Sequence, residues 1–216
     1  MNASDGLETT QVRAVLWDFG GVVLTSPFDA FNRYEDSAGL PRDTIRRLNA
    51  TNPDTNAWAR FERNEVDTDG FAAIFETEAA AAGHVLDAAA ILAALDGEVR
   101  PQMVEALRRL KAAGFGQALL TNNVRPMGSR QAAHTDILAM FDAIVESSVV
   151  GIRKPEPRFY EIALEMMGIT ANQAVFLDDL GINLKPAAAM GIRTIKVKDP
   201  DLALTELETV VGIALR

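Results

Sequence analysis

The chain contains no cysteine, and this absence excludes several kinds of chemistry at once. Without thiols there can be no disulfides, no thiolate nucleophile and no zinc site with cysteine ligands. No apolar run approaches the ~20 residues that cross a bilayer, so we expect no contact with a membrane. Residues 1–11 are polar and lack a basic start followed by an apolar segment, which predicts a cytoplasmic protein without a secretory signal.

Positive charge is also scarce in this chain. It has 21 Lys and Arg against 30 Asp and Glu, which gives a net charge of -9. Nucleic-acid-binding proteins usually carry a basic stripe, and the short pairs Arg46-Arg47 and Arg108-Arg109 do not form one. We therefore expect no nucleic-acid partner. A phosphate site in such an acidic protein needs a metal ion or a few well-placed cations. The sequence carries no signal for an oligomeric state.

The apolar residues, by contrast, are plentiful and regularly spaced. The chain has 216 residues, of which 48% are hydrophobic, enough for a large buried core. Short apolar runs predict strands at 12–17, 117–120, 143–145, 174–177 and 192–197. Helical patterns separate them, beginning at Pro101 and then covering 155–168, 183–190 and 201–215. This alternation predicts an α/β fold with a Rossmann-like parallel sheet in a three-layer αβα core.

One region interrupts the alternation of strands and helices. Residues 28–97 have helical periodicity and almost no β-branched runs, with aromatic pairs at i, i+3 spacing such as Trp58 and Phe61. Thr68-Asp69 can cap one of the helices in this stretch. We predict an inserted all-helical cap at 28–97. Residues 1–27 and 98–216 then make up the core domain.

Four polar clusters follow four of the predicted strands. In a parallel sheet the carboxyl ends of the strands lie on one edge, where ligands bind. A carboxylate, a hydroxyl, an ammonium group and a pair of carboxylates would therefore converge there. Together they predict a site for phosphoryl transfer on a small phosphorylated substrate. The clusters are Asp18, Thr121-Asn122, Lys154 and Asp178-Asp179.

Each of these side chains suits a particular part of that chemistry. Asp18 can attack phosphorus and form an aspartyl phosphate. Thr121, Asn122 and Lys154 can hold phosphate oxygens. Asp18 and an acid from 178–179 can bind Mg²⁺, which prefers hard oxygen ligands. The metal also offsets the repulsion between an anionic nucleophile and an anionic substrate.

The order and spacing of the four clusters resemble the motifs of the haloacid dehalogenase-like hydrolases over nearly the whole chain. The runs at 149–157 and 176–187 are similar to the phosphatase domain of soluble epoxide hydrolases. The opening run at 18–22 resembles a branch that includes domains fused to acyl-CoA dehydrogenases. The resemblance implies that the helical cap closes over the site and supplies substrate contacts.

The same resemblance implies roles for individual residues. Asp179, the second acid of its pair, is expected to bind the metal together with Asp18 and the backbone carbonyl of Gly20. Asp178 is expected to pair with Lys154 and orient it. Asn183 is expected to fasten the turn that follows.

Gly20 departs from the usual pattern of the family. Most phosphatases that the chain resembles carry there a second Asp, which serves as general acid and base. We expect a Mg²⁺-dependent phosphomonoesterase in which another group or a good leaving group compensates for the missing Asp. A non-catalytic module that binds a phosphorylated ligand or a partner protein is an alternative. A dehalogenase is the weaker alternative, since such enzymes need no Mg²⁺ and lack a pair like Asp178-Asp179.

Overall fold

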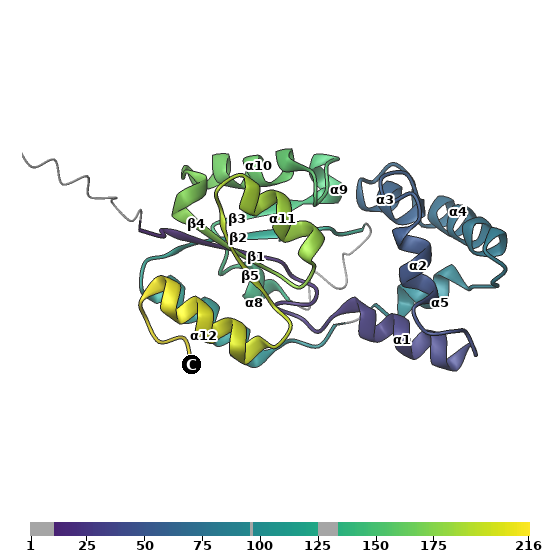
Figure 1. Ribbon diagram of the computed structural model, residues 1–216, viewed down its shortest axis with the longest axis horizontal. Coiled ribbons are helices and arrows are strands. Elements are labelled where there is room, and N and C mark those ends of the chain that lie inside the picture. Colours follow the sequence, from purple (N-terminus) through teal and green to yellow (C-terminus); the bar gives the residue numbers. More distant parts are fainter. Residues whose placement is uncertain (1–10, 96, 125–133) are drawn as a thin grey trace, which may run out of the picture.

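Five strands form one parallel sheet at the centre of the larger part of the molecule (Figure 1). The computed structural model describes residues 11–95, 97–124 and 134–216. The strand order is β3-β2-β1-β4-β5, so β1 lies in the middle. Every neighbouring pair is parallel, which requires a crossover between consecutive strands. The strands are β1 Ala14–Trp17, β2 Gly116–Thr121, β3 Ala143–Glu146, β4 Ala174–Asp178 and β5 Arg193–Lys196.

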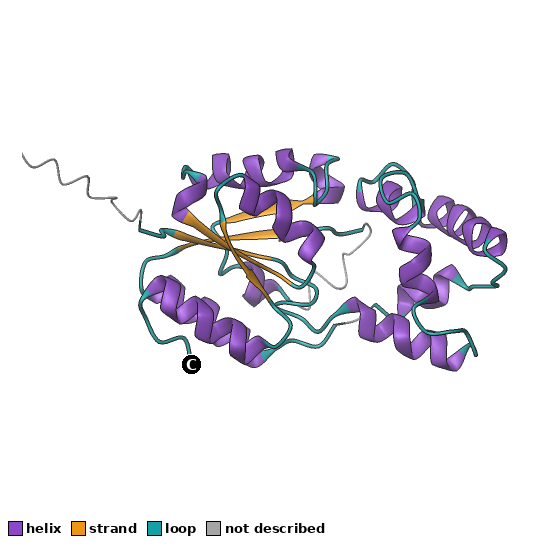
Figure 2. Ribbon diagram, viewed as in Figure 1, coloured by secondary structure: helices purple, strands orange, loops and turns teal. Residues whose placement is uncertain are grey.

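Helices cover both faces of this sheet and give the predicted three-layer core (Figure 2). One face carries α6 (Pro101–Ala112), α8 (Thr135–Leu138) and α12 (Pro200–Val211). The other carries α10 (Pro157–Met167) and α11 (Gly181–Ala189). A short helix α9 (Ser147–Val150) follows β3, and a 3₁₀ turn at Ala171–Gln173 precedes β4.

The central strands β1 and β4 are buried on both sides, because their successive side chains point to opposite faces and helices cover both. In β1, Trp17 packs toward α6 and α12, whereas Leu16 packs toward α10 and α11. Both side chains have no exposed surface. This double burial explains why β1 is a continuous apolar run and β4 is apolar up to its last residue, as is usual in parallel sheets. The edge strand β5 instead carries the exposed residues Arg193 and Lys196. A carboxylate directly after a strand such as β1 therefore emerges from a dry core.

The segment between β1 and α6 is helical and contains its own hydrophobic cluster. Five helices pack around stacked and edge-to-face aromatic rings. Trp58 lies 4.8 Å from Phe71 between ring centroids, and Phe71 lies 5.3 Å from Phe75. These contacts explain the aromatic pairs in the sequence. The helices are α1 Pro27–Ser37, α2 Thr44–Ala50, α3 Ala57–Glu62, α4 Thr68–Ala81 and α5 Ala88–Ala93.

The starts of these helices are fixed by polar side chains. The prediction that Thr68-Asp69 caps α4 is wrong by one residue, because Asp67 accepts the N–H of Gly70 at 2.9 Å. At the start of α2, a buried acid from α1 accepts the backbone N–H groups instead. Glu35 has no exposed surface, and its two oxygens accept the N–H groups of Asp43 and Ile45, both at 2.8 Å.

Two chain segments connect helices α1–α5, the helices of the predicted cap, to the sheet, and they run side by side. The N–H of Thr25 donates to the carbonyl of Glu98 at 2.8 Å, and the N–H of Glu98 donates to the Thr25 hydroxyl at 2.9 Å. Arg100 donates to the carbonyl of Gly21 at 2.8 Å. These bonds fix the base of the cap close to the end of β1. No helix in the described part of the chain has the length and apolar character needed to cross a membrane.

Candidate active site

The carboxyl ends of β1, β2 and β4 lie together because these strands are neighbours in the sheet. Asp18 directly follows β1, Thr121 is the last residue of β2, and Asp178 is the last residue of β4. Lys154 reaches the same edge from the loop between α9 and α10. The side chains of Asp18, Lys154, Asp178 and Asp179 are thus brought together as the topology predicts, and Thr121 ends the neighbouring strand.

Lys154 is the charge at the centre of this edge. Its Nζ lies 2.7 Å from Oδ1 of Asp18 and 2.8 Å from Oδ2 of Asp178. The residue is only 2% exposed, so both ion pairs are removed from water. A buried ammonium group requires such partners, because an unpaired charge in the interior costs several kcal/mol. Lys154 therefore links the β1 and β4 carboxylates into one unit.

Asp178 is held by donors on both of its oxygens. Besides Lys154, it accepts the N–H of Leu180 at 2.8 Å and the side-chain amide of Asn183 at 3.1 and 3.0 Å. The carbonyl of Asn183 in turn accepts the hydroxyl of Tyr160 at 2.7 Å. Asp178 has no exposed surface. It is saturated with donors and oriented toward Lys154, and Asn183 fastens the turn that opens α11.

Asp179 contacts Ser26 and lies closely packed against the backbone of Gly21. Its Oδ2 accepts the Ser26 hydroxyl at 3.3 Å. Gly21 has a φ of +89°, and a Cβ placed on it would lie 2.3 Å from Oδ2 of Asp179. Only glycine allows this approach. Sequence reasoning missed Gly21 and Ser26 as parts of the site, although the Gly20-Gly21 pair was a signal for a close approach.

The donor set fits a hard divalent cation. Carboxylate oxygens of Asp18, Asp178 and Asp179 all lie within 4.8 Å of one another. When all four groups are ionised, the three carboxylates and the one ammonium group give this edge a net charge of about -2. Oxygen donors at this spacing match the preference of Mg²⁺. Because Asp178 is saturated by other donors, Asp18 and Asp179 are the residues that would hold the metal.

The crowding of negative charge changes the ionisation of the cluster. Burial raises the pKa of Asp18 to about 8, and the charges of Asp178 and Asp179 add to this against the opposing charge of Lys154. Burial, together with the charge of Asp178, raises the pKa of Asp179 to about 6. Burial by itself lowers the pKa of Lys154, but the charges of Asp178 and Asp18 outweigh it and raise the pKa above its ordinary value. Without a cation the edge retains protons.

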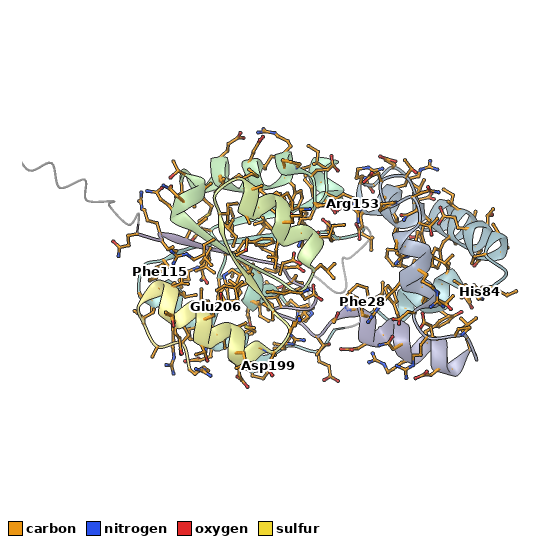
Figure 3. The ribbon with its side chains drawn as sticks, in the orientation of Figure 1. Phe28, His84, Phe115, Arg153, Asp199 and Glu206 are labelled. Atoms are coloured by element: carbon orange, nitrogen blue, oxygen red, sulfur yellow. The ribbon has the colours of Figure 1, made fainter. Side chains whose placement is uncertain are left out.

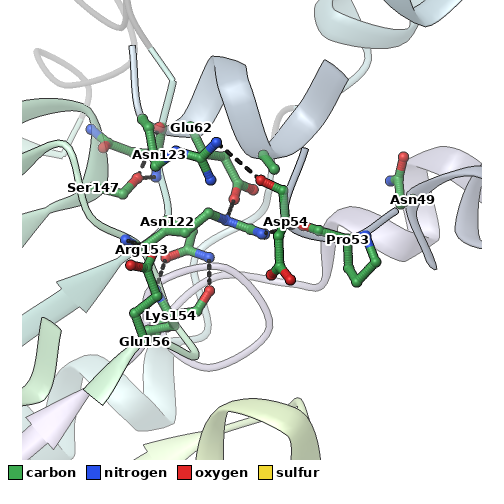
Figure 4. A network of polar contacts seen from close by, with 12 residues as sticks. Asn49, Pro53, Asp54, Glu62, Asn122, Asn123, Ser147, Arg153, Lys154 and Glu156 are labelled. Carbon is green, nitrogen blue, oxygen red and sulfur yellow. Dashed lines mark hydrogen bonds and ion pairs between the residues drawn. The ribbon is translucent and has the colours of Figure 1, made fainter. Parts of the chain in front are cut away.

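The end of β2 contributes in a different manner. The carboxamide of Asn122 donates to the carbonyl of Lys154 at 3.0 Å and accepts the N–H of Lys154 at 2.9 Å (Figure 4). It thus clamps the backbone that carries the central lysine. The next residue, Asn123, is buried and bonds to Ser147 and Ser148 at the start of α9. Thr121 lies half-buried at the end of β2, opposite Glu146 of β3 and beyond the last residue of β2 that pairs with β1.

Gly20 lies on the side of the loop that faces the cap. A Cβ on Gly20 would meet Cδ of Pro27 at 3.5 Å, which is an ordinary contact. Pro27 is the first residue of α1, and Figure 3 shows its neighbour Phe28 at the junction between core and cap. The position therefore has room for a side chain, unlike Gly21. The lack of an acid at position 20 is not imposed by packing at its Cβ.

Comparison with known proteins identifies the family. The sequence model of the haloacid dehalogenase-like hydrolases matches residues 12–191. The chain belongs to the haloacid dehalogenase-like hydrolases. This family membership agrees with the sheet order and with the acid that follows β1, and it confirms the resemblance read from the sequence motifs.

Several relatives of this hydrolase have curated names. The chain is 35% identical to acyl-CoA dehydrogenase family member 10 of Mus musculus and 30% identical to bifunctional epoxide hydrolase 2 of Sus scrofa, with 94% of the chain covered in each case. It spans only 19% and 40% of those two proteins. The sesquiterpene phosphatase astK of Aspergillus oryzae is 27% identical over 94% of the chain and 98% of its own length.

A solved structure shows the same fold. A haloacid dehalogenase family enzyme of Bacteroides thetaiotaomicron, described as a complex with magnesium and inorganic phosphate, aligns with a TM-score of 0.60. The alignment covers 86% of this chain and 93% of that chain at 19% identity. At this identity the likeness establishes the fold alone.

Proposed function

We propose that this hydrolase is a Mg²⁺-dependent phosphomonoesterase that acts through an aspartyl phosphate on Asp18. The observation that carries the proposal is the charge of the sheet edge. Lys154 is buried between Asp18 and Asp178, and Asp179 brings a third carboxylate within 4.8 Å. The raised pKa values of Asp18 and Asp179 express the same deficit of positive charge. A divalent cation would offset this excess of negative charge, and with the cation bound the edge could also accept an anionic phosphate ester.

In the proposed first step, a carboxylate oxygen of Asp18 forms a bond to phosphorus, and the bond from phosphorus to the leaving oxygen breaks. Within the described residues, Lys154 and the N–H of Phe19 both contact Oδ1 of Asp18, which leaves Oδ2 for the attack. Lys154, Thr121 and the backbone at Asn122 are proposed to hold the phosphate oxygens. Bound Mg²⁺ would supply positive charge beside the nucleophile and the phosphate.

In the proposed second step, water attacks phosphorus, inorganic phosphate leaves and the Asp18 carboxylate is regenerated. The leaving alkoxide of the first step gains a proton and the attacking water loses one. The usual Asp would perform both transfers, and Gly20 performs neither. Without it, the second step should be the slower one, because general acid–base catalysis is worth ~10²–10⁴-fold.

The remaining assignments follow from the same proposal. Asp18, Asp179 and the carbonyl of Gly20 are the proposed metal ligands, and Asp178 and Asn183 keep Lys154 in place. Residues 28–97 are proposed to act as the cap domain over a core domain of residues 1–27 and 98–216. The substrate is proposed to be a small phosphorylated compound. The phosphatase among the relatives and the magnesium and phosphate bound by the Bacteroides enzyme support this choice.

Gly20 favours one alternative, a module that binds a phosphorylated ligand without turning it over. Release of inorganic phosphate from a panel of phosphate monoesters separates the two functions. We expect turnover that needs Mg²⁺, stops with a chelator and is lost in Asp18→Asn. Calorimetric binding of inorganic phosphate with Mg²⁺, without turnover of any ester, would instead establish the binding module.

A further inference from the structure

Arg153, the residue before Lys154, reaches across to the cap. Its Nε lies 2.6 Å from Oε2 of Glu62, and its Nη1 donates to the carbonyl of Pro53 at 2.9 Å (Figure 4). Glu62 is the last residue of α3, and Pro53 lies in the loop before that helix. The side chains of Arg153 and Glu62 are only 17% and 16% exposed. One guanidinium group thus joins two separate pieces of the cap to the core.

This contact lies away from the segments that connect the two parts of the molecule. Those segments meet where Thr25 and Glu98 bond, just before the start of α1 at Pro27. Arg153 is at the opposite end of the junction, where α3 approaches α9, and Figure 3 shows it there with Phe28 at the other end. A contact far from the connecting segments moves most when the cap rotates about them. It is therefore well placed to hold the cap down.

The backbone that carries Arg153 is the same one that positions the central lysine. Asn122 clamps Lys154 through both its N–H and its carbonyl, and the Lys154 side chain is pinned between Asp18 and Asp178. Two neighbouring residues of one short loop thus point to different partners. Arg153 holds the cap, while Lys154 holds the carboxylates of the sheet edge.

We propose that the ion pair of Arg153 with Glu62, together with the bond to Pro53, is a latch that holds the cap closed and positions Lys154. Arg153 is a positioning residue in this proposal, since it acts through Lys154 and the cap and touches no reacting atom. A groove of ≈ 500 Å³ on the junction is lined by Arg153, Asp54, Arg63, Pro155 and Glu156. Residues of both cap and core line this groove, so it would widen when the two parts separate. Water could then reach the ion pair of Arg153 with Glu62.

The latch is suited to reversible opening. Charged hydrogen bonds in a partly buried setting are strong, yet the separated groups regain water when the contact opens. Opening would leave Glu62 and Arg153 exposed on opposite sides of the entrance. High salt would then favour the open state, because it screens charges that are exposed to solvent. A fixed structural ion pair would lack this effect on cap position.

The test uses the full-length protein and hydrogen exchange with and without Mg²⁺ and inorganic phosphate. Arg153→Met keeps the aliphatic stem and removes the charge, and Glu62→Gln removes the partner's charge. Arg158→Met is the matched control, because Arg158 pairs with Glu161 and Glu165 on its own helix. We expect faster hydrogen exchange in both α3 and α9 in each latch variant, with no change in β1 and β4. Combining the two substitutions should not add to the effect of either one, because both remove the same ion pair. The double charge reversal Arg153→Glu with Glu62→Arg should restore part of the protection.

A kinetic readout depends on the proposed function, whereas the exchange readout does not. If the protein turns over phosphate esters, the latch variants should raise KM by roughly 3- to 10-fold, within the usual coupling of residues in contact, with a smaller change in kcat. Parent-like exchange in both latch variants would overturn the latch even if turnover is normal. An absence of turnover in the parent would count against the phosphatase alone, and faster exchange at α3 and α9 would still support the latch.

Discussion

Lys154 and Arg153 are neighbours in the chain, but they belong to two different electrostatic environments. Lys154 is 2% exposed and lies between two buried aspartates within the core, at an edge that three carboxylates share. Arg153 lies at the junction of core and cap and pairs with one acid whose side chain is 16% exposed. The first environment is buried and shifts the pKa values of its carboxylates upward. The second is proposed to open to solvent. The comparison separates the residues proposed to perform chemistry from the residue proposed to control access to them.

Replacing Lys154 and Arg153 separately should give the largest difference in stability between the two environments. Lys154→Met leaves the buried carboxyl groups of Asp18 and Asp178 without their counter-charge. We expect its free energy of unfolding to fall by ~3–5 kcal/mol. Arg153→Met should cost only about 1 kcal/mol, because its groups regain water. Chemical denaturation of both metal-free variants measures the difference, and equal losses would mean that the two environments are alike.

Adding the missing acid at position 20 should change the rate of the chemistry at the sheet edge and leave the contact between core and cap unchanged. Nitrophenyl phosphate has a good leaving group, so transfer to Asp18 should be fast and hydrolysis slow, with a burst of nitrophenol. Gly20→Asp should speed the slow phase by up to ~10²–10⁴-fold, since position 20 has room beside Pro27. Gly20→Asn is the control of equal size without a proton to transfer. A similar gain in both variants would show that shape, and not acid–base chemistry, is responsible.

A single methyl group should weaken the site when it is added at Gly21 but have little effect when it is added at Gly20. Gly21→Ala places Cβ 2.3 Å from Oδ2 of Asp179 at a φ of +89°, so the carboxylate must move. We expect a loss of about 1–3 kcal/mol in stability and weaker Mg²⁺ binding. Gly20→Ala makes only an ordinary contact with Pro27 at 3.5 Å and should bind Mg²⁺ as the parent does. Calorimetric titration of both variants with Mg²⁺ measures this, and equal affinities would remove the contact between Gly21 and Asp179 from the site.

Changes of pH should act on the sheet edge in a predictable direction. The pKa values of about 8 for Asp18 and about 6 for Asp179 exceed the ordinary value of 3.8. The folded, metal-free protein therefore holds more protons than the unfolded chain between pH ~4 and ~8, and its stability falls as the pH rises through this window. Mg²⁺ competes with these protons, so its affinity should rise from pH 6 to pH 8 with proton release. Affinity that is flat across this range would contradict the role of these carboxylates. In Asp179→Asn the pH dependence of Mg²⁺ affinity should weaken below pH ~6, where Asp18 alone still exchanges a proton with the metal.

The sequence predicted the core well because its physics is local or periodic. Apolar runs gave the strands, and their parallel order brought Asp18, Lys154 and Asp178 together. Ends of elements were less accurate. The predicted helix at 201–215 stops at Val211, because Gly212 adopts a left-handed φ of 75°. The helix start at Asp67 was assigned one residue too late, since Thr68 and Asp69 are also good caps.

The contacts between core and cap could not be predicted in this manner. The pairing of Arg153 with Glu62 joins residues 91 positions apart in the chain. Nothing in either local sequence distinguishes these two residues from other surface charges. The same is true of Ser26, which reaches Asp179 across 153 positions. Periodicity assigns a residue to a buried face, but it does not say which partner lies opposite when a helical insertion folds back on a sheet.

The central claim is that Asp18 carries the phosphoryl group, and the most direct test is to find that group on the protein. The parent would be mixed with nitrophenyl phosphate and Mg²⁺, quenched in acid during the burst and analysed by peptide mass spectrometry. We predict one phosphoryl group on the peptide that contains Asp18, absent with a chelator and absent in Asp18→Asn. Turnover with no modified Asp18, or with the phosphoryl group on another residue, would contradict the proposed mechanism.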